Sequence, residues 1–200
     1  MALACCPAFP LHVKGDQTKT YMTESSILRL VYPQWQGGIV ASWMPDIPAD
    51  DVSRGYYLGA QLLNFLAPQN GQKTAEIPIS LDINDRAEEK GINSRAAIVR
   101  QTQAALDILR DENPDKIVTL GGDCAVSVAP FTWLFSKYQD DVAVVWIDAH
   151  PDVNLPYDEY KGYHAMALTA CLVKSAVSSH RSWLPAVLEA GRLLSLYLRV

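Results

Sequence analysis

Two short apolar stretches, separated by enough chain for one helix, constrain the fold most strongly. The first runs from Ile117 to Leu120 and leads into Gly121-Gly122-Asp123-Cys124, and the second runs from Val142 to Ile147 and ends in Asp148-Ala149-His150-Pro151-Asp152. An apolar run without alternation is typical of a strand covered on both faces. With a helix predicted near residues 127 to 138, the unit is a strand, helix, strand crossover, which is right-handed when its strands are parallel. The sequence therefore predicts an α/β fold.

The residues that follow the second strand carry metal-ligand chemistry. Asp148 and His150 are two positions apart, so they project to the same side, and Asp152 joins them if the backbone stays extended. Carboxylates with an imidazole suit a divalent ion of intermediate hardness, such as manganese, and a pair of such ions can make a bound water acidic. Taken singly, Asp148 is explained as a loop cap, His150 as a core residue and Asp152 as a turn former. Together, at the carboxyl end of a strand where open α/β sheets bind ligands, they favour a metal site.

The stretches before this unit predict one strand and one helix, followed by a less regular segment. Ile27 to Tyr32 is expected to be a strand. A helix is predicted from about 53 to 66, with Asp51 or Ser53 as its cap. Its apolar face is expected to comprise Leu58, Leu62, Phe65 and Leu66. Residues 77 to 81 contain Pro78, so they are expected to form an edge strand or an irregular segment.

Two further helices are predicted around the apolar strands. The first has about 17 residues, is capped by Asn93 or Ser94 and ends at Asn113-Pro114. Its apolar stripe comprises Ile98, Thr102, Ala105, Leu106 and Leu109. The second helix is expected to start near Gly162 and to run to Leu172.

Composition narrows the class of protein. The chain has 200 residues, 49% of them hydrophobic, and a net charge of −5, which suits one globular domain and offers no basic surface for nucleic acid. No run approaches the roughly 18 apolar residues of a membrane span. The four cysteines form no spaced framework, which indicates a reducing compartment, and we predict a cytoplasmic protein. We expect an irregular arm over residues 1–24, an α/β domain over 25–173, and a divergent amphipathic or disordered tail over 174–200.

The motifs after the two apolar strands resemble those of the arginase and agmatinase (ureohydrolase) family. Its members carry Gly-Gly-Asp-His after one strand and Asp-Ala-His-x-Asp after the next. The resemblance covers about residues 27 to 173 and implies a three-layer α/β/α fold around a mostly parallel sheet. It also implies a dinuclear manganese centre and hydrolysis of a carbon–nitrogen bond in a small guanidino or amidine substrate, with release of urea or an amine.

Carried over by position, the resemblance assigns roles to particular residues. It implies that Asp148 bridges two ions, that Asp152 binds the first ion and that His150 binds the second. His164 matches a histidine that moves protons, and Asn154 matches a residue near the polar tail of the substrate.

The chain departs from the family pattern in three places. Cys124 stands where a histidine ligand is usual, and a soft thiolate favours zinc or iron over manganese. Residues 155 to 161 do not reproduce the loop that reads an amino acid's α-carboxylate. After Asp152 the acids are Asp158, Glu159 and Glu189, without the later Asp-x-Asp and glutamate of the family. We therefore expect a fold that is incomplete on its C-terminal side and impaired activity in this form.

Two other functions compete with hydrolysis. An open sheet edge invites pairing with another chain, so the protein could be a catalytically silent partner of a full-length relative, or a homo-oligomer. Alternatively, Cys124 could act as a nucleophile with His150 or His164 as its base. For the Leu-rich tail, covering that edge as an amphipathic helix and remaining disordered are equally open interpretations.

Overall fold

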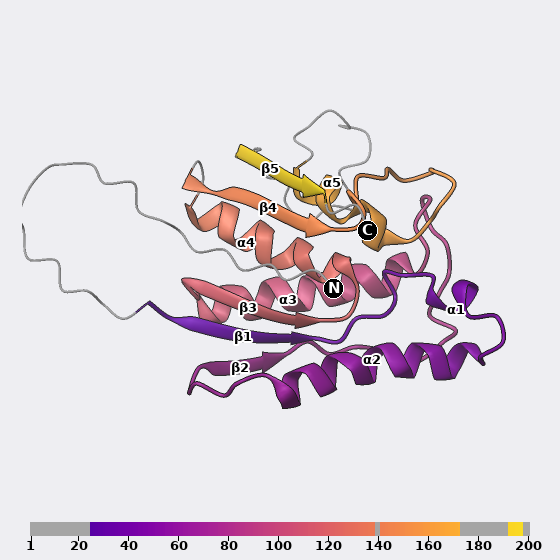
Figure 1. The fold of residues 1–200 in the computed structure, drawn as a ribbon, viewed down its shortest axis with the longest axis horizontal. Helices are drawn as coiled ribbons and strands as arrows, with labels where there is room; N and C mark the ends of the chain where they lie inside the picture. The colour runs from indigo at the N-terminus through magenta and orange to yellow at the C-terminus, as the bar shows by residue number, and fades with distance from the viewer. Residues whose placement is uncertain (1–24, 139–140, 173–191, 198–200) are drawn as a thin grey trace, which may run out of the picture.

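The computed structural model describes residues 25–138, 141–172 and 192–197, and Figure 1 shows their parallel strands with helices packed beside them. In chain order the elements are β1 (Ile27–Tyr32), α1 (Val40–Trp43), α2 (Ala49–Leu66), β2 (Lys73–Glu76), α3 (Arg95–Glu112), β3 (Lys116–Gly121), the 3-10 helix η1 (Cys124–Ser127), α4 (Val128–Tyr138), β4 (Ala143–Asp148), the 3-10 helix η3 (Tyr163–Met166), α5 (Ala167–Leu172) and β5 (Arg192–Tyr197). The predicted α/β class is confirmed.

The described strands form two hydrogen-bonded groups. One is a parallel sheet in the order β2-β1-β3, and the other is the parallel pair β4-β5. The predicted strand, helix, strand unit is present as β3, α4 and β4, and the two strands point the same way in Figure 1, but they are not hydrogen-bonded to each other and belong to separate groups. In the larger sheet Tyr32 lies opposite Gly121, which places the carboxyl ends of β1 and β3 side by side.

Burial along β4 alternates, which corrects the prediction that this strand is covered on both faces. Val144 and Trp146 are buried against α4 and α5, and Trp146 meets the ring of Phe131 edge-on. Val145 and Ile147, which point to the other face, are 45% and 49% exposed. Side chains alternate between the faces of a strand, so an apolar sequence alone does not show whether both faces are covered.

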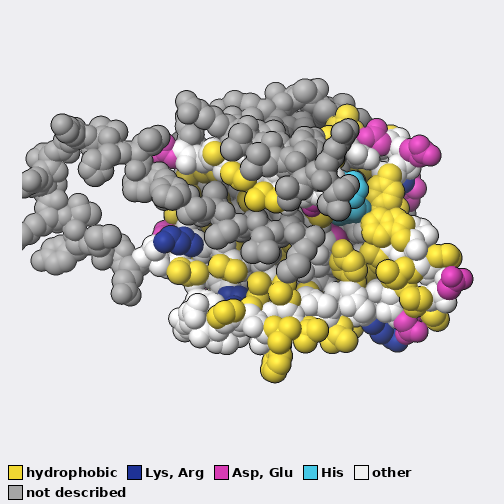
Figure 2. Space-filling model, in the orientation of Figure 1, with side chains coloured by type: hydrophobic (Ala, Val, Ile, Leu, Met, Phe, Trp, Pro, Cys, Tyr) yellow, Lys and Arg dark blue, Asp and Glu magenta, His cyan; other side chains and the backbone are white. Residues whose placement is uncertain are grey.

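The apolar stripe of α2 points outward rather than into the core. Leu58, Leu62, Phe65 and Leu66 are all exposed, Phe65 by 81%, and hydrophobic side chains line the lower edge of Figure 2 where α2 lies. The buried side of α2 carries Val52, Ser53 and Ala60. The helix also begins at Ala49 instead of near residue 53, and the Ser53 hydroxyl donates to the Ala49 carbonyl inside the helix.

The predicted helix after Ser94 is confirmed as α3, and its buried side includes Ile98, Thr102, Ala105 and Leu109. Ser94 occupies the cap position, but its hydroxyl donates to the Asn93 side chain and makes no capping bond. Residues 77 to 81 lie outside any strand, because the edge strand β2 forms on the more polar residues before them. The irregular alternative predicted for residues 77 to 81 is therefore confirmed, and the edge strand of the described sheet is β2, which pairs only with β1.

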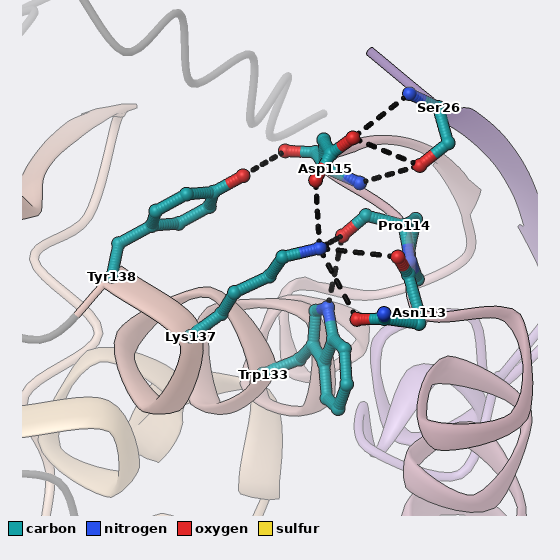
Figure 3. A network of polar contacts seen from close by, with 7 residues as sticks. All are labelled: Ser26, Asn113, Pro114, Asp115, Trp133, Lys137 and Tyr138. Atoms are coloured by element: carbon teal, nitrogen blue, oxygen red, sulfur yellow. Dashed lines mark hydrogen bonds and ion pairs between the residues drawn. The ribbon is translucent and has the colours of Figure 1, made fainter. Parts of the chain in front are cut away.

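A polar network fixes α4 against the end of α3 and the start of β1 (Figure 3). The Lys137 ammonium lies 2.8 Å from an Asp115 carboxylate oxygen and donates to the Pro114 carbonyl. The other Asp115 oxygen accepts from the Ser26 amide and hydroxyl, and the Tyr138 hydroxyl donates to the Asp115 carbonyl. The network therefore anchors the C-terminal end of α4, the helix that continues directly from η1.

The structure tests only part of what the sequence predicts for the two ends of the chain. The arm over residues 1–24 and most of the tail lie outside the described residues. Residues 192–197 form β5, so the amphipathic helix considered for the tail is wrong over this stretch. None of the described helices has the length and apolar character needed to cross a lipid bilayer.

Candidate metal centre

The loops that follow β1 and β3 are joined through the buried carboxylate of Asp123. It accepts hydrogen bonds from the Gly37 amide at 2.8 Å, the Ala125 amide at 2.9 Å and the Gln34 side-chain amide at 3.2 Å. Burial raises the pKa of Asp123 to about 7, although these donors oppose the rise. Asp123 is therefore a structural clamp that holds the next residue, Cys124, at the end of β3.

Gly122 is required because the backbones of these loops nearly touch. A β-carbon at Gly122 would lie 1.6 Å from the Gln34 carbonyl oxygen, and a β-carbon at Gly37 would lie 2.2 Å from an Asp123 oxygen. Close approach of the chain explains Gly122, and its φ angle is not among the positive ones in the described residues. Glycine is therefore needed at position 122 because of this close approach and not because of a left-handed turn.

Asp148 lies at the end of β4 and faces Cys124. One of its oxygens, Oδ2, is 3.6 Å from the Cys124 sulfur, and the other accepts from the His150 amide at 2.9 Å. The His150 side chain is 79% exposed, with Nδ1 3.8 Å from Asp148 Oδ1. Asp148 is thus shared between a half-buried sulfur and a surface imidazole.

Asp152 reaches the same place by a turn. Its φ is +50°, so the chain does not stay extended as the sequence interpretation assumed. The Asp152 carbonyl accepts from the amides of Leu168 and Thr169 in the first turn of α5. Its side chain is buried, and Oδ2 has no hydrogen-bond partner within the described part of the chain. Burial raises the pKa of Asp152 to about 6.

His164, on η3, completes the group. Its amide donates to the Gly37 carbonyl at 3.0 Å, and its Nε2 lies 2.8 Å from the Tyr160 hydroxyl. Burial lowers the pKa of the imidazole, which favours the neutral form. Trp43 meets the ring of His164 edge-on, with centroids 5.7 Å apart.

Three ligand atoms of different chemistry therefore converge: one each from Cys124, Asp152 and His164 lies within 4.8 Å of the other two. A thiol, a carboxylate and an imidazole are the ligands that zinc takes in proteins. The orphaned Asp152 oxygen gives an independent reason for a cation, because a buried acceptor without a donor is costly. The described residues thus fit a divalent ion at this position.

The sequence-predicted site residues are only partly gathered. Cys124, Asp152 and His164 converge, and Asp148 contacts the Cys124 sulfur beside them, whereas the exposed His150 lies outside the compact group of donors. Asn154 is half-buried, and its backbone N–H donates to the carbonyl of Ala165, the residue after His164. Burial, with the charges of Asp152 and Asp148, raises the pKa of the Cys124 thiol well above its usual value, which disfavours a free nucleophilic thiolate.

Sequence reasoning missed the loop after β1 and two aromatic residues. Gln34 and Gly37 brace Asp123, and they could have been found by applying the rule of strand carboxyl ends to β1 as well. Trp43 and Tyr160 flank His164, and no local pattern marks them.

Comparison with known proteins places the chain in a family. A model of the arginase family matches residues 61–187, which include Cys124, Asp148, Asp152 and His164. The chain belongs to the arginase family. The arginase of Schizosaccharomyces pombe is 32% identical over 85 residues, which are 42% of this chain and 26% of that protein. The arginase of Glaciozyma antarctica is 30% identical over 87 residues, which are 41% of this chain and 25% of that protein.

A solved family structure supports the fold. The Entamoeba histolytica arginase, crystallised with L-ornithine, aligns over 90% of this chain and 60% of its own, with a TM-score of 0.64 and 15% identity. That match bears on the fold alone. The chain spans about a quarter of the curated relatives' length in these matches, and part of the arginase fold.

Proposed function

We propose that this chain carries the metal-binding part of a ureohydrolase-type hydrolase that acts on a carbon–nitrogen bond of a guanidino or amidine compound. The convergence of Cys124, Asp152 and His164 carries the proposal. Family membership supports the reaction class, and the donor set supports a divalent ion. The sulfur ligand favours zinc or iron over the manganese that the family resemblance implies.

We assign the ion to Cys124, Asp152 and His164, with Asp148 beside them. A divalent ion held there would make a water molecule more acidic and polarise the substrate. His150 and Asp148 would together hold a second ion, since His150 Nδ1 lies 3.8 Å from Asp148 Oδ1. Asn154, whose backbone is hydrogen-bonded to Ala165 next to His164, is proposed to face the tail of the substrate.

Side chains of this protein would transfer the proton that the reaction requires and would hold the site residues in position. Hydrolysis adds water to the guanidinium carbon, breaks one carbon–nitrogen bond and leaves urea and an amine, which must receive a proton. Moving that proton, the role that the family resemblance gives His164, is the alternative to its assignment as a ligand, and the Tyr160 hydroxyl fixes the orientation of its ring in either case. Asp123 keeps Cys124 in place without taking part in the reaction.

Urea or amine release from a panel of guanidino compounds tests this function. The full chain is loaded with zinc, iron(II) or manganese and compared with a chelated sample and with Asp152→Asn. We expect turnover that needs the metal and is lost in Asp152→Asn. Equal turnover in the chelated sample would contradict the proposal.

A second function is favoured by one observation. Among the described strands, β3 pairs only with β1 and β4 only with β5, so each has an edge open to another strand. A longer relative could supply that strand, and this chain would then be a silent regulatory partner. Co-elution with a full-length relative and no urea release would support this function, whereas normal turnover by the isolated chain would exclude it.

A further inference from the structure

A wall of two aromatic rings stands beside the candidate metal centre. Trp43, the last residue of α1, stacks on Tyr160 with ring centroids 6.2 Å apart and planes 19° apart. Both rings also meet His164 edge-on, Tyr160 at 5.4 Å and Trp43 at 5.7 Å. Segments about 120 residues apart in the chain are thus brought together at His164.

Polar contacts of the Tyr160 hydroxyl hold this wall in place. The Tyr160 hydroxyl lies 2.8 Å from His164 Nε2 and accepts from the Ile39 amide at 3.3 Å. These contacts tie the loop that carries Tyr160 to the start of α1. A ring fixed in this way loses little freedom when it binds a ligand.

Trp43 nevertheless remains 55% exposed. Tyr160 and His164 contact the indole but leave more than half of the residue accessible to a ligand. Figure 2 shows hydrophobic side chains bordering a histidine at this end of the molecule, with acidic side chains at the rim. A large exposed indole beside a candidate metal centre is a surface suited to a ligand.

The charges around the wall select the kind of ligand. A carboxylate oxygen of Asp152 lies within 4.8 Å of a His164 nitrogen, Asp148 also acts on His164 electrostatically, and Asp158 and Glu159 directly precede Tyr160 in the chain. The nearest ammonium along this loop, that of Lys161, is directed back to the Asp158 carbonyl. The surroundings therefore favour a cation over a carboxylate, and the face of an indole attracts a cation.

We propose that the Trp43–Tyr160 wall binds the distal cationic group of the substrate, so that this chain prefers guanidino compounds with an amine tail to those with a carboxylate tail. The inference rests on the proposed function, which supplies the guanidino class, and adds a specificity-determining residue. Trp43 lies outside residues 61–187, which the family model matches, so the family does not assign it.

The test uses two compounds that differ in tail charge, 4-aminobutylguanidine and 4-guanidinobutanoate. Binding to the full chain, with and without zinc, is followed through the indole N–H resonance that disappears in Trp43→Phe, and by calorimetry. We expect wild type to bind the amine-tailed compound more tightly. Trp43→Ala should weaken that binding about 2–5-fold, the range for an exposed cation–π contact, and should barely change the carboxylate-tailed compound.

Two variants serve as controls. Trp43→Phe keeps an aromatic face and should retain most of the preference, and Phe65→Ala, which removes an exposed ring on α2, should leave it unchanged. Unchanged binding in Trp43→Ala, tighter binding of the carboxylate-tailed compound, or no saturable binding by wild type would overturn the proposal.

Failure of the proposed function has a different signature. Suppose that wild type binds no metal and hydrolyses neither compound, but Trp43→Ala still loses the preference for the amine-tailed compound. The proposed function would then be contradicted, and the binding role of the Trp43–Tyr160 wall would be supported. If wild type binds metal and turns over substrate while Trp43→Ala leaves ligand binding unchanged, only the binding role of the Trp43–Tyr160 wall would be contradicted.

Discussion

The Cys124 sulfur lies 3.6 Å from Oδ2 of Asp148, although 24 residues separate them in the chain. The contact joins the end of β3 to the end of β4, two strands that share no backbone hydrogen bond among the described residues. The candidate centre is therefore held together by side chains and loops at this point rather than by a continuous sheet.

The identity of the ligand at position 124 should set the choice of metal. A thiolate prefers zinc to manganese, whereas an imidazole is less selective. We expect Cys124→His to lower the ratio of zinc to manganese affinity relative to wild type. Competitive metal titration measures that ratio, and Cys171→Ser is the control, since Cys171 is buried in α5 away from the group of donors. A ratio equal to that of wild type would show that Cys124 does not bind the ion.

The two histidines should behave differently. His164 is among the converging donors and His150 is exposed, so we expect His164→Ala to weaken the tighter metal-binding step and His150→Ala to affect only a second, weaker one. Calorimetric titration resolves the two steps. Full metal stoichiometry in His164→Ala with loss of turnover would instead identify His164 as a proton carrier. An effect of His150→Ala on the tighter step would contradict this assignment.

Gly122 should tolerate no side chain. Its β-carbon would lie 1.6 Å from the Gln34 carbonyl, so we expect Gly122→Ala to lower the free energy of unfolding by about 3 kcal/mol. The matched control is Gly55→Ala in α2, where a β-carbon meets nothing within 4 Å and should be neutral or add about 0.5–1 kcal/mol. Urea denaturation compares the two variants, and equal stabilities would contradict the close approach.

The network in Figure 3 should make stability sensitive to acid. The Lys137 ammonium, and then the Ser26 amide, lower the pKa of Asp115 from 3.8 to about 2. A carboxylate with a lowered pKa stabilises the fold above its unfolded pKa and loses this contribution as pH falls toward its folded pKa. We therefore expect the stability gap between wild type and Asp115→Asn to be constant above pH 5 and to close between about pH 4 and 2.

Urea titrations of both proteins at several pH values measure that gap. Because Asp115 is partly exposed, salt should narrow the gap at neutral pH. A gap that stays constant down to pH 2 would show that the ion pair does not contribute.

The sequence predicted the elements next to the site better than their arrangement. The strand and ligand residues around Cys124 and Asp148 could be identified because apolar runs and short motifs are local properties. The outward stripe of α2, with Phe65 exposed, could not be anticipated, because periodicity shows that a helix has an apolar side but not what covers it. The clamp on Asp123 and the wall at Trp43 depend on distant segments, and no local pattern encodes them.

Zinc titration of the full chain tests the central claim most directly. Substituting a residue that only hydrogen-bonds to a metal ligand typically lowers metal affinity about 10–100-fold. Removing a ligand itself should lower the affinity at least as much. We expect wild type to bind one zinc ion tightly and Asp152→Asn to bind it at least about 10-fold more weakly, with Asp158→Asn unchanged. Equal zinc affinity in wild type and in the combined Cys124→Ser, Asp152→Asn and His164→Ala variant would show that these residues do not form a metal centre.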